Sequence, residues 1–222
     1  MRVLAALLLI ALAGCAPVER QTITVFAAAS LTGTFEEIAD AFEAENPNVD
    51  VVFNFGGSSA LATQIDEGAP ADVFASASTA QLSGDIFATN RLEIAVASGN
   101  AAEVSGIEDF ANPNLTFAVC AVEVPCGAAA QTLFEQARVV PSIDTYEQEV
   151  KAVLTKVEFG EVDAGLVYVT DVLEAGVDGI EVESAPVDYP IAALTDKGNA
   201  FVAFVLSAKG QAILQAAGFG AP

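Results

Sequence analysis

Strand-like and helix-like segments alternate along this chain of 222 residues, and such alternation predicts an α/β fold with largely parallel sheets. Period-two or continuous apolar patterns predict strands at 22–28, 49–55, 71–75, 92–97, 115–119, 163–169, 180–183 and 190–194. Apolar residues at helical spacing predict helices at 31–42, 59–67, 127–138, 148–159 and 199–217. Ligands of such folds bind beyond the carboxyl ends of the strands, so the loops that follow strands are the first candidates for a site.

Two of the strand-to-helix junctions carry a serine. The run VFAAASL contains Ser30, and the run FGGSSAL contains Ser58. A helix N-terminus has unpaired backbone N–H groups and the positive end of the helix dipole, so a hydroxyl at that point adds a further donor for an anion. Two such corners facing one cleft would hold an oxyanion without a cationic side chain. The alternative is that each serine only caps its helix.

The N-terminus has the pattern of an export signal. Arg2 is followed by eleven apolar residues (3–13), too few to cross a hydrocarbon core of about 30 Å and typical of a secretory signal at 1–14. The ending Leu-Ala-Gly-Cys resembles the bacterial lipobox, which implies that Cys15 is lipidated and that 15–21 form the lipidated cysteine and its tether. The alternative is an ordinary signal in which the cysteine occurs by chance.

Cysteine usage agrees with export. With Cys15 lipidated, Cys120 and Cys126 remain as an even pair in an oxidising compartment, which favours a disulfide. So short a loop constrains the unfolded chain by only about 2 kcal/mol, and its main effect would be to fix the local backbone. The alternative is two buried thiols. A zinc site is disfavoured because the chain has no histidine and no clustered carboxylates, and we expect no direct metal ligands and no cofactor.

Composition limits the possible partners. The formal net charge of −22 becomes −23 when the signal with Arg2 is removed, so nucleic acid is not expected as a partner. The 53% hydrophobic content of the chain is sufficient for one large core or two smaller ones. We expect two lobes, the first formed by 22–88 and 189–222 and the second by 89–188. The crossings expected at 87–92 and 187–191 could also be connections within one domain.

Seven runs of sequence, in their order along the chain, resemble the molybdate-binding proteins of bacterial ABC importers. These runs are ITVFAAASL, FNFGGSSALATQI, GAPADVFASA, FATNRL, CAVEVPCG, AGLVYVTD and YPIAAL. The resemblance implies a two-lobed periplasmic-binding-protein-like fold of type II, each lobe with a mostly parallel sheet flanked by helices. It also implies a monomer that captures molybdate or tungstate between its lobes through neutral donors and delivers the ion to a membrane permease with its ATPase.

The resemblance further assigns ligand donors position by position. Two are serine hydroxyls, two are backbone N–H groups near helix starts, and one is a phenol; in this sequence they are Ser30, Ser58, Cys126, Val150 and Tyr168. Ser59 replaces Ser58 if the register is shifted by one residue. Each position also has a purely structural interpretation, as a capping serine, a helix-start amide, a core valine or an aromatic residue at a strand end. The segment between Ser78 and Phe87 is shorter than in the family, so its effect on closure and transport is open.

Other function classes fit less well. An enzyme with a Ser-His-Asp triad is excluded by the absence of histidine, and no G-x-x-x-x-G-K-[ST] run is present for nucleotide phosphates. The alternatives that remain are a binding protein for sulfate or phosphate, a lysine-dependent serine hydrolase and a structural surface lipoprotein. The basic residues nearest the expected site are interpreted as surface or lobe-edge charges: Arg91, Arg138, Lys151 and Lys156.

Overall fold

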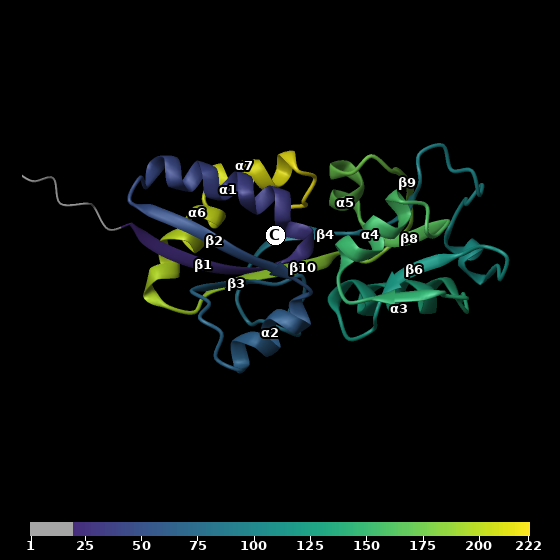
Figure 1. The fold of residues 1–222 in the computed structure, drawn as a ribbon, viewed down its shortest axis with the longest axis horizontal. Coiled ribbons are helices and arrows are strands. Elements are labelled where there is room, and N and C mark those ends of the chain that lie inside the picture. Colours follow the sequence, from purple (N-terminus) through teal and green to yellow (C-terminus); the bar gives the residue numbers. More distant parts are fainter. Residues whose placement is uncertain (1–19) are drawn as a thin grey trace, which may run out of the picture.

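The computed structural model describes residues 20–222. The expected signal at 1–14, the lipidated Cys15 and residues 16–19 of its tether lie outside the described residues. Within 20–222, no helix has the length and apolar character needed to cross a membrane. The described chain forms two lobes side by side, each with its own sheet (Figure 1).

The first lobe contains a five-stranded sheet in the order β2-β1-β3-β10-β4. Its strands are β1 (Gln21–Ala28), β2 (Val49–Gly56), β3 (Val73–Ala75), β4 (Asp85–Asn90) and β10 (Val187–Ala193). Strand β10 is antiparallel to both of its neighbours, whereas β1 is parallel to β2 and β3. One face packs against α1 (Thr32–Glu45), α6 (Asn199–Leu206) and α7 (Ala208–Ala216), and the other packs against α2 (Ser58–Asp66) (Figure 1).

The second lobe repeats this plan with the order β7-β6-β8-β5-β9. Its strands are β5 (Leu92–Val96), β6 (Phe117–Cys120), β7 (Thr145–Glu147), β8 (Ala164–Tyr168) and β9 (Asp178–Glu181). Again one strand, β5, is antiparallel to its two neighbours. The helices of this lobe are α3 (Pro125–Ala137), α4 (Val150–Glu158) and α5 (Val169–Glu174). Two mixed sheets with flanking helices confirm the predicted α/β fold.

The chain crosses between the lobes twice. Only Arg91 separates β4 of the first sheet from β5 of the second, and 182–186 lead from β9 back to β10. The boundaries expected after residue 88 and before residue 189 fall inside β4 and β10. Beside the first crossing, the Asn90 side-chain amide donates a hydrogen bond to Thr170 Oγ1 at 2.8 Å, which links the two lobes.

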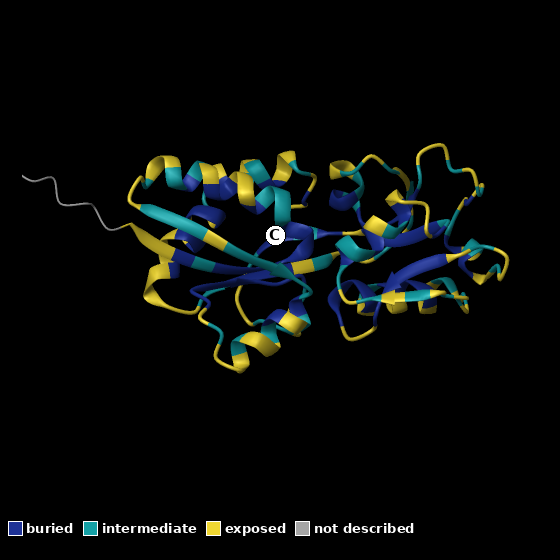
Figure 2. Ribbon diagram, in the orientation of Figure 1, coloured by how far each residue is buried: buried dark blue, intermediate teal, exposed yellow. Residues whose placement is uncertain are grey.

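Each lobe has its own apolar core. In the first lobe, the ring of Phe201 lies 6.1 Å from that of Phe35 and 5.5 Å from that of Phe42, all between the sheet and its helices. In the second, the rings of Phe110 and Phe117 stack at 4.3 Å. Figure 2 shows the buried residues concentrated in the strands and the exposed residues on the outer sides of the helices. Burying each such side chain stabilises the fold by about 1.5–3 kcal/mol.

Three elements differ from the sequence-based expectation. The closing helix expected at 199–217 is two helices, broken at Ser207, whose Oγ accepts a hydrogen bond from the N–H of Gly210 and caps α7. The segment expected as a connection at 87–92 belongs largely to β4, which pairs with β10 across a register shift at Tyr189 and Pro190. The short strand β7 was not expected.

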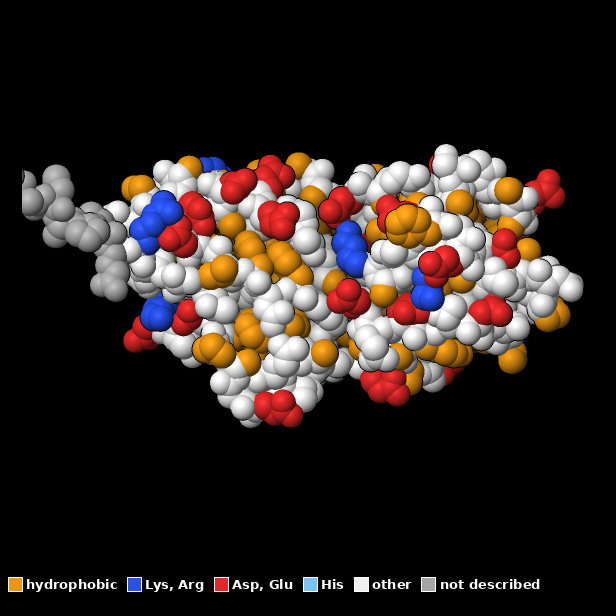
Figure 3. All heavy atoms as spheres, viewed as in Figure 1, with side chains coloured by type: hydrophobic (Ala, Val, Ile, Leu, Met, Phe, Trp, Pro, Cys, Tyr) orange, Lys and Arg blue, Asp and Glu red, His pale blue; other side chains and the backbone are white. Residues whose placement is uncertain are grey.

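Acidic side chains dominate the surface. The chain has 30 Asp and Glu against 8 Lys and Arg. On the face seen in Figure 3, acidic groups are spread over both lobes and basic groups are few. Several of the basic groups are paired with acids, as in Lys209 with Glu45 at 2.7 Å.

Candidate functional site

A small cavity of about 20 Å³ lies between the lobes and is lined by residues of both. This volume exceeds the roughly 10–15 Å³ that one water requires, so the cavity suits a compact ligand. The structure brings all five sequence-predicted ligand residues to its wall: Ser30, Ser58, Cys126, Val150 and Tyr168. The fallback residue Ser59 is not among the lining residues, and its hydroxyl donates a hydrogen bond to the carbonyl of Glu123 at 2.5 Å.

The two serines come from neighbouring strand ends of the first lobe. Strands β1 and β2 are parallel, with Ala28 paired to Gly56, so both chains turn out of the sheet at the same edge. Ser30 lies in the short 3-10 helix (Ala29–Leu31) before α1, and Ser58 is the first residue of α2. Parallel pairing of the two strands therefore places the two hydroxyls on one side of the cavity.

The hydrogen bonds of these serines leave protons for a ligand. Ser58 Oγ accepts a bond from the N–H of Ala77 at 3.0 Å, so its own proton remains available. Ser30 Oγ lies 2.9 Å from Tyr189 Oη. Burial raises the pKa of the Tyr189 phenol well above its usual value, so the phenol stays protonated and can donate to Ser30. Both serine hydroxyls can then donate into the cavity.

Two helix starts face the cavity from the second lobe. Cys126 lies in the first turn of α3, directly after Pro125, and Val150 is the first residue of α4. Backbone N–H groups in the first turn of a helix have no acceptor within the helix. Cys126 is also joined to Cys120 by a disulfide, which ties the start of α3 to the end of β6. The side chain of Cys126 is therefore bonded in the disulfide, and its backbone N–H can donate to a ligand.

Tyr168 supplies a phenol whose Oη has no hydrogen-bond partner among residues 20–222. It is the last residue of β8, its side chain is buried, and its Oη makes no hydrogen bond with any described residue. Burial, followed by the nearby carboxylate of Asp171, raises the pKa of the phenol, so the group is a donor at any physiological pH. Leaving a buried hydroxyl unpaired costs about 1–3 kcal/mol, and an oxyanion in the cavity would remove this cost.

Glu149 brings the only charged side chain to the described wall of the cavity. It precedes α4, and burial raises the pKa of its carboxyl group. Sequence reasoning missed this residue, although an acidic residue just before a helix is a detectable signal. Sequence reasoning also missed Tyr189, which no local pattern connects to Ser30.

The four basic residues named from the sequence do not line the cavity. The ammonium of Lys151 lies 3.1 Å from the carboxylate of Asp171 and 2.7 Å from that of Glu174. Burial alone would lower the pKa of Lys151, but the effect of these two carboxylates is larger, and the pKa of Lys151 is raised overall. Lys156 lies near two glutamates, and neither Arg91 nor Arg138 is among the lining residues. In the chain from residue 20 onward, no cluster of three Cys, Asp or Glu side chains could hold a metal ion.

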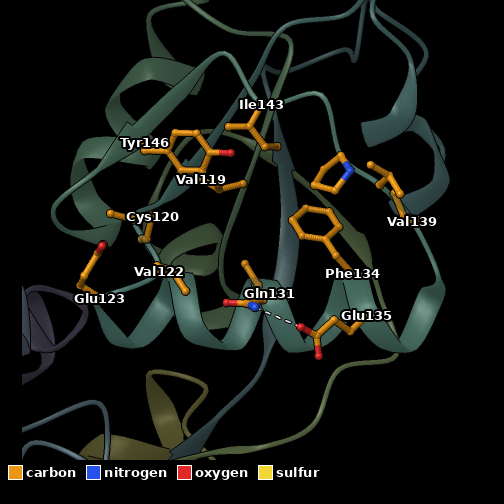
Figure 4. Close-up of a pocket in the computed structure, with 15 residues that line it drawn as sticks. Val119, Cys120, Val122, Glu123, Gln131, Phe134, Glu135, Val139, Ile143 and Tyr146 are labelled. Carbon is orange, nitrogen blue, oxygen red and sulfur yellow. Dashed lines mark hydrogen bonds between the residues drawn. The ribbon is translucent and has the colours of Figure 1, made fainter.

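A larger groove of about 650 Å³ lies in the second lobe, between α3 and the chain leading into β7 (Figure 4). Its wall is mainly apolar, with Val119, Phe134 and Ile143 turned toward the space (Figure 4). Its charged lining residues are Glu123 and Glu135, so it lacks the converging donors that an anion requires. The small cavity between the lobes is therefore the better candidate site.

Comparisons with known proteins agree with this geometry. A family model described as bacterial extracellular solute-binding protein matches residues 23–220. The molybdate-binding protein ModA of Mycobacterium tuberculosis (strain ATCC 25618 / H37Rv) is 40% identical over 223 residues, which cover 91% of this chain and 85% of that relative.

Two solved structures have the same fold. The periplasmic molybdate-binding protein of Azotobacter vinelandii has a TM-score of 0.71 at 22% identity and covers 90% of this chain and 99% of its own. The sulfate-binding protein SubI of Mycobacterium tuberculosis has a TM-score of 0.77 at 16% identity, covering 90% and 86%. This chain belongs to the family of bacterial extracellular solute-binding proteins, and it is a binding protein rather than an enzyme.

Proposed function

We propose that this protein is the extracytoplasmic component of an ABC importer and captures molybdate or tungstate between its lobes. The observation that carries the proposal is the buried phenol of Tyr168, which has no hydrogen-bond partner in the described part of the chain and shares a small cavity with two serine hydroxyls and two helix starts. The name of the mycobacterial relative, a molybdate-binding protein, supports the choice of ion. Ser30, Ser58, Cys126, Val150 and Tyr168 are the proposed ligands.

Neutral donors are sufficient to hold a dianion. A hydrogen bond from a neutral donor to a charged acceptor contributes about 1.5–3 kcal/mol, so five to seven of them support roughly micromolar or tighter binding after the costs of association. The donors lie on helix starts and strand ends, which fixes their separation. A cavity of fixed size selects among tetrahedral anions by their radius, whereas a flexible lysine or arginine would accept any anion.

Calorimetry with four tetrahedral anions tests the proposal. The mature protein should bind molybdate and tungstate with similar affinity, because the two ions have nearly the same size. Sulfate and phosphate should bind at least about tenfold more weakly, which corresponds to 1.4 kcal/mol. Preferred binding of sulfate or phosphate would instead establish the alternative of another oxyanion importer. No binding of any of the four would contradict the whole proposal.

Membership of an extracellular solute-binding family implies export, and we extend this to a lipid anchor at Cys15. The first described strand, β1, begins at the end of the first lobe that lies away from the second lobe (Figure 1). A tether attached there would leave the cleft accessible to the membrane permease and its ATPase. We further propose that the protein acts as a monomer, because the donors of one chain complete the site.

A further inference from the structure

Gly57 lies at the cavity wall and contacts the second lobe through its backbone. It links β2 to α2 at the end of the first lobe that faces the second (Figure 1). A Cβ atom built on Gly57 would lie 2.2 Å from the backbone carbonyl oxygen of Gln148, in the second lobe. Carbon and oxygen atoms do not approach below about 3.0 Å, so this arrangement of the lobes has no room for a side chain at residue 57.

The backbone of Gly57 does not itself require glycine. Its φ of −63° and ψ of 128° are extended values that any residue adopts. The neighbouring Gly56 differs in its surroundings: a Cβ there would lie 3.5 Å from Leu61 Cδ2 and 3.9 Å from Glu149 Oε2, which are ordinary contacts. Two adjacent glycines on the same strand end therefore differ in whether a methyl group fits between the lobes.

The contact at Gly57 is reinforced by a second one nearby. Ser59 Oγ, two residues further along, donates to the carbonyl of Glu123 in the second lobe. The carbonyl groups of Gln148 and Glu123 precede the helices α4 and α3, whose first turns contain Val150 and Cys126. The segment 57–59 thus meets the second lobe beside both helix starts that face the cavity.

We propose that Gly57 is a positioning residue of the anion site. The absence of its side chain allows the lobes to close to the separation at which donors of both lobes reach one ion. A methyl group would hold the lobes about 1 Å further apart, and a hydrogen bond of about 2.9 Å lengthened by that amount is lost. This inference rests on the proposed function, since it requires an anion held between the lobes.

The pair Gly57→Ala and Gly56→Ala tests the inference. Molybdate affinity, measured by calorimetry, should fall at least about tenfold in Gly57→Ala and change less than about threefold in Gly56→Ala. The unfolding temperature of each ligand-free variant should remain close to that of the wild type, because the proposal assigns the contact to the closed arrangement of the lobes and not to the core of either lobe. Small-angle scattering should show that saturating molybdate compacts the wild type and Gly56→Ala more than Gly57→Ala.

Two outcomes would overturn the inference. Wild-type affinity in Gly57→Ala would show that the contact does not govern closure. A large loss of stability in ligand-free Gly57→Ala would place the contact in the resting fold and not in closure. A wild-type protein that binds sulfate but not molybdate would contradict the proposed choice of ion alone, and the same comparison of the two variants would then be made with sulfate.

Discussion

A buried phenol without a partner is an energetic cost that a ligand can remove. Tyr168→Phe deletes the Oη and keeps the ring, so we expect molybdate affinity to fall about ten- to a hundredfold, from the loss of one charge-assisted hydrogen bond. Ser58→Ala should have a similar effect. Ligand-free stability should fall by about 1–3 kcal/mol in Ser58→Ala, which leaves the buried N–H of Ala77 without its acceptor, and stay the same or rise in Tyr168→Phe. Calorimetry and thermal unfolding measure the two quantities.

Tyr146→Phe provides the matched control, because Tyr146 lies in the apolar groove of the second lobe and is 60% exposed. It should bind as the wild type does. Lys151→Gln should also retain molybdate affinity, since its ammonium is bonded to Asp171 and Glu174. Loss of binding in Lys151→Gln with unchanged binding in Tyr168→Phe would contradict a site made of neutral donors.

The carboxyl group of Glu149 should make anion binding depend on pH. Burial raises its pKa, and a dianion in the same cavity raises it further, so binding is accompanied by proton uptake. Affinity should therefore fall as pH rises from the raised pKa of the ligand-free protein through the still higher pKa of the complex, by up to tenfold per unit of difference between the two. Calorimetry between about pH 5 and about pH 8 measures this slope.

Glu149→Gln should flatten the pH dependence and bind molybdate more tightly than the wild type at the upper end of the range. Glu123→Gln, which removes one exposed carboxylate outside the small cavity, is the control and should keep the wild-type slope. Equal slopes in the wild type and Glu149→Gln would assign the pH dependence to another group.

At the residue scale, the sequence predicted which of these residues would line the cavity better than it predicted their surroundings. Ser30 and Ser58 follow strands and Tyr168 ends one, and the position of a residue at the end of a strand is encoded locally. Tyr189 and Asp171 act through contacts with Ser30 and Lys151. The Ser30 contact joins residues 159 positions apart, and no local pattern carries such information.

At the scale of elements, the disulfide loop links β6 to the start of α3. Replacing both Cys120 and Cys126 with alanine should lower the free energy of unfolding by about 2 kcal/mol, measured in urea. Molybdate affinity should weaken but persist, because the backbone N–H of residue 126 remains. Reducing agent should lower the free energy of unfolding of the wild type and leave that of the double variant unchanged. Complete loss of binding in the double variant would indicate that the disulfide is required to hold the backbone N–H of residue 126 in position.

The boundaries of the elements followed local patterns, and the exceptions have physical causes. The helix expected at 199–217 has a continuous apolar pattern, but the capping hydroxyl of Ser207 competes with the helical hydrogen bonds and starts a new helix. Strand β4 depends on hydrogen bonds to β10, about a hundred residues away. Strand β7 is three residues long and lies at a sheet edge, so its local signal is weak.

At the scale of the whole molecule, the proposed lipid anchor is separable from binding. Cys15→Ser should move the protein from the membrane fraction to the soluble fraction and prevent labelling by a fatty acid. Its affinity for molybdate should remain that of the wild type, because the folded lobes begin with β1 at Gln21. Fractionation, lipid labelling and calorimetry check these three statements. Membrane attachment that persists in Cys15→Ser would rule out the anchor.

The acidic surface has a further consequence, for the rate of capture. A net charge of −22 repels an approaching dianion over about one Debye length, which is the opposite of electrostatic steering. Added salt screens this repulsion, whereas the donors in the cavity act at contact distance. In stopped-flow measurements of tyrosine emission, the association rate constant should increase about threefold or more between about 20 and about 200 mM salt, with an unchanged dissociation rate constant. Such a protein would capture its anion fastest in saline surroundings.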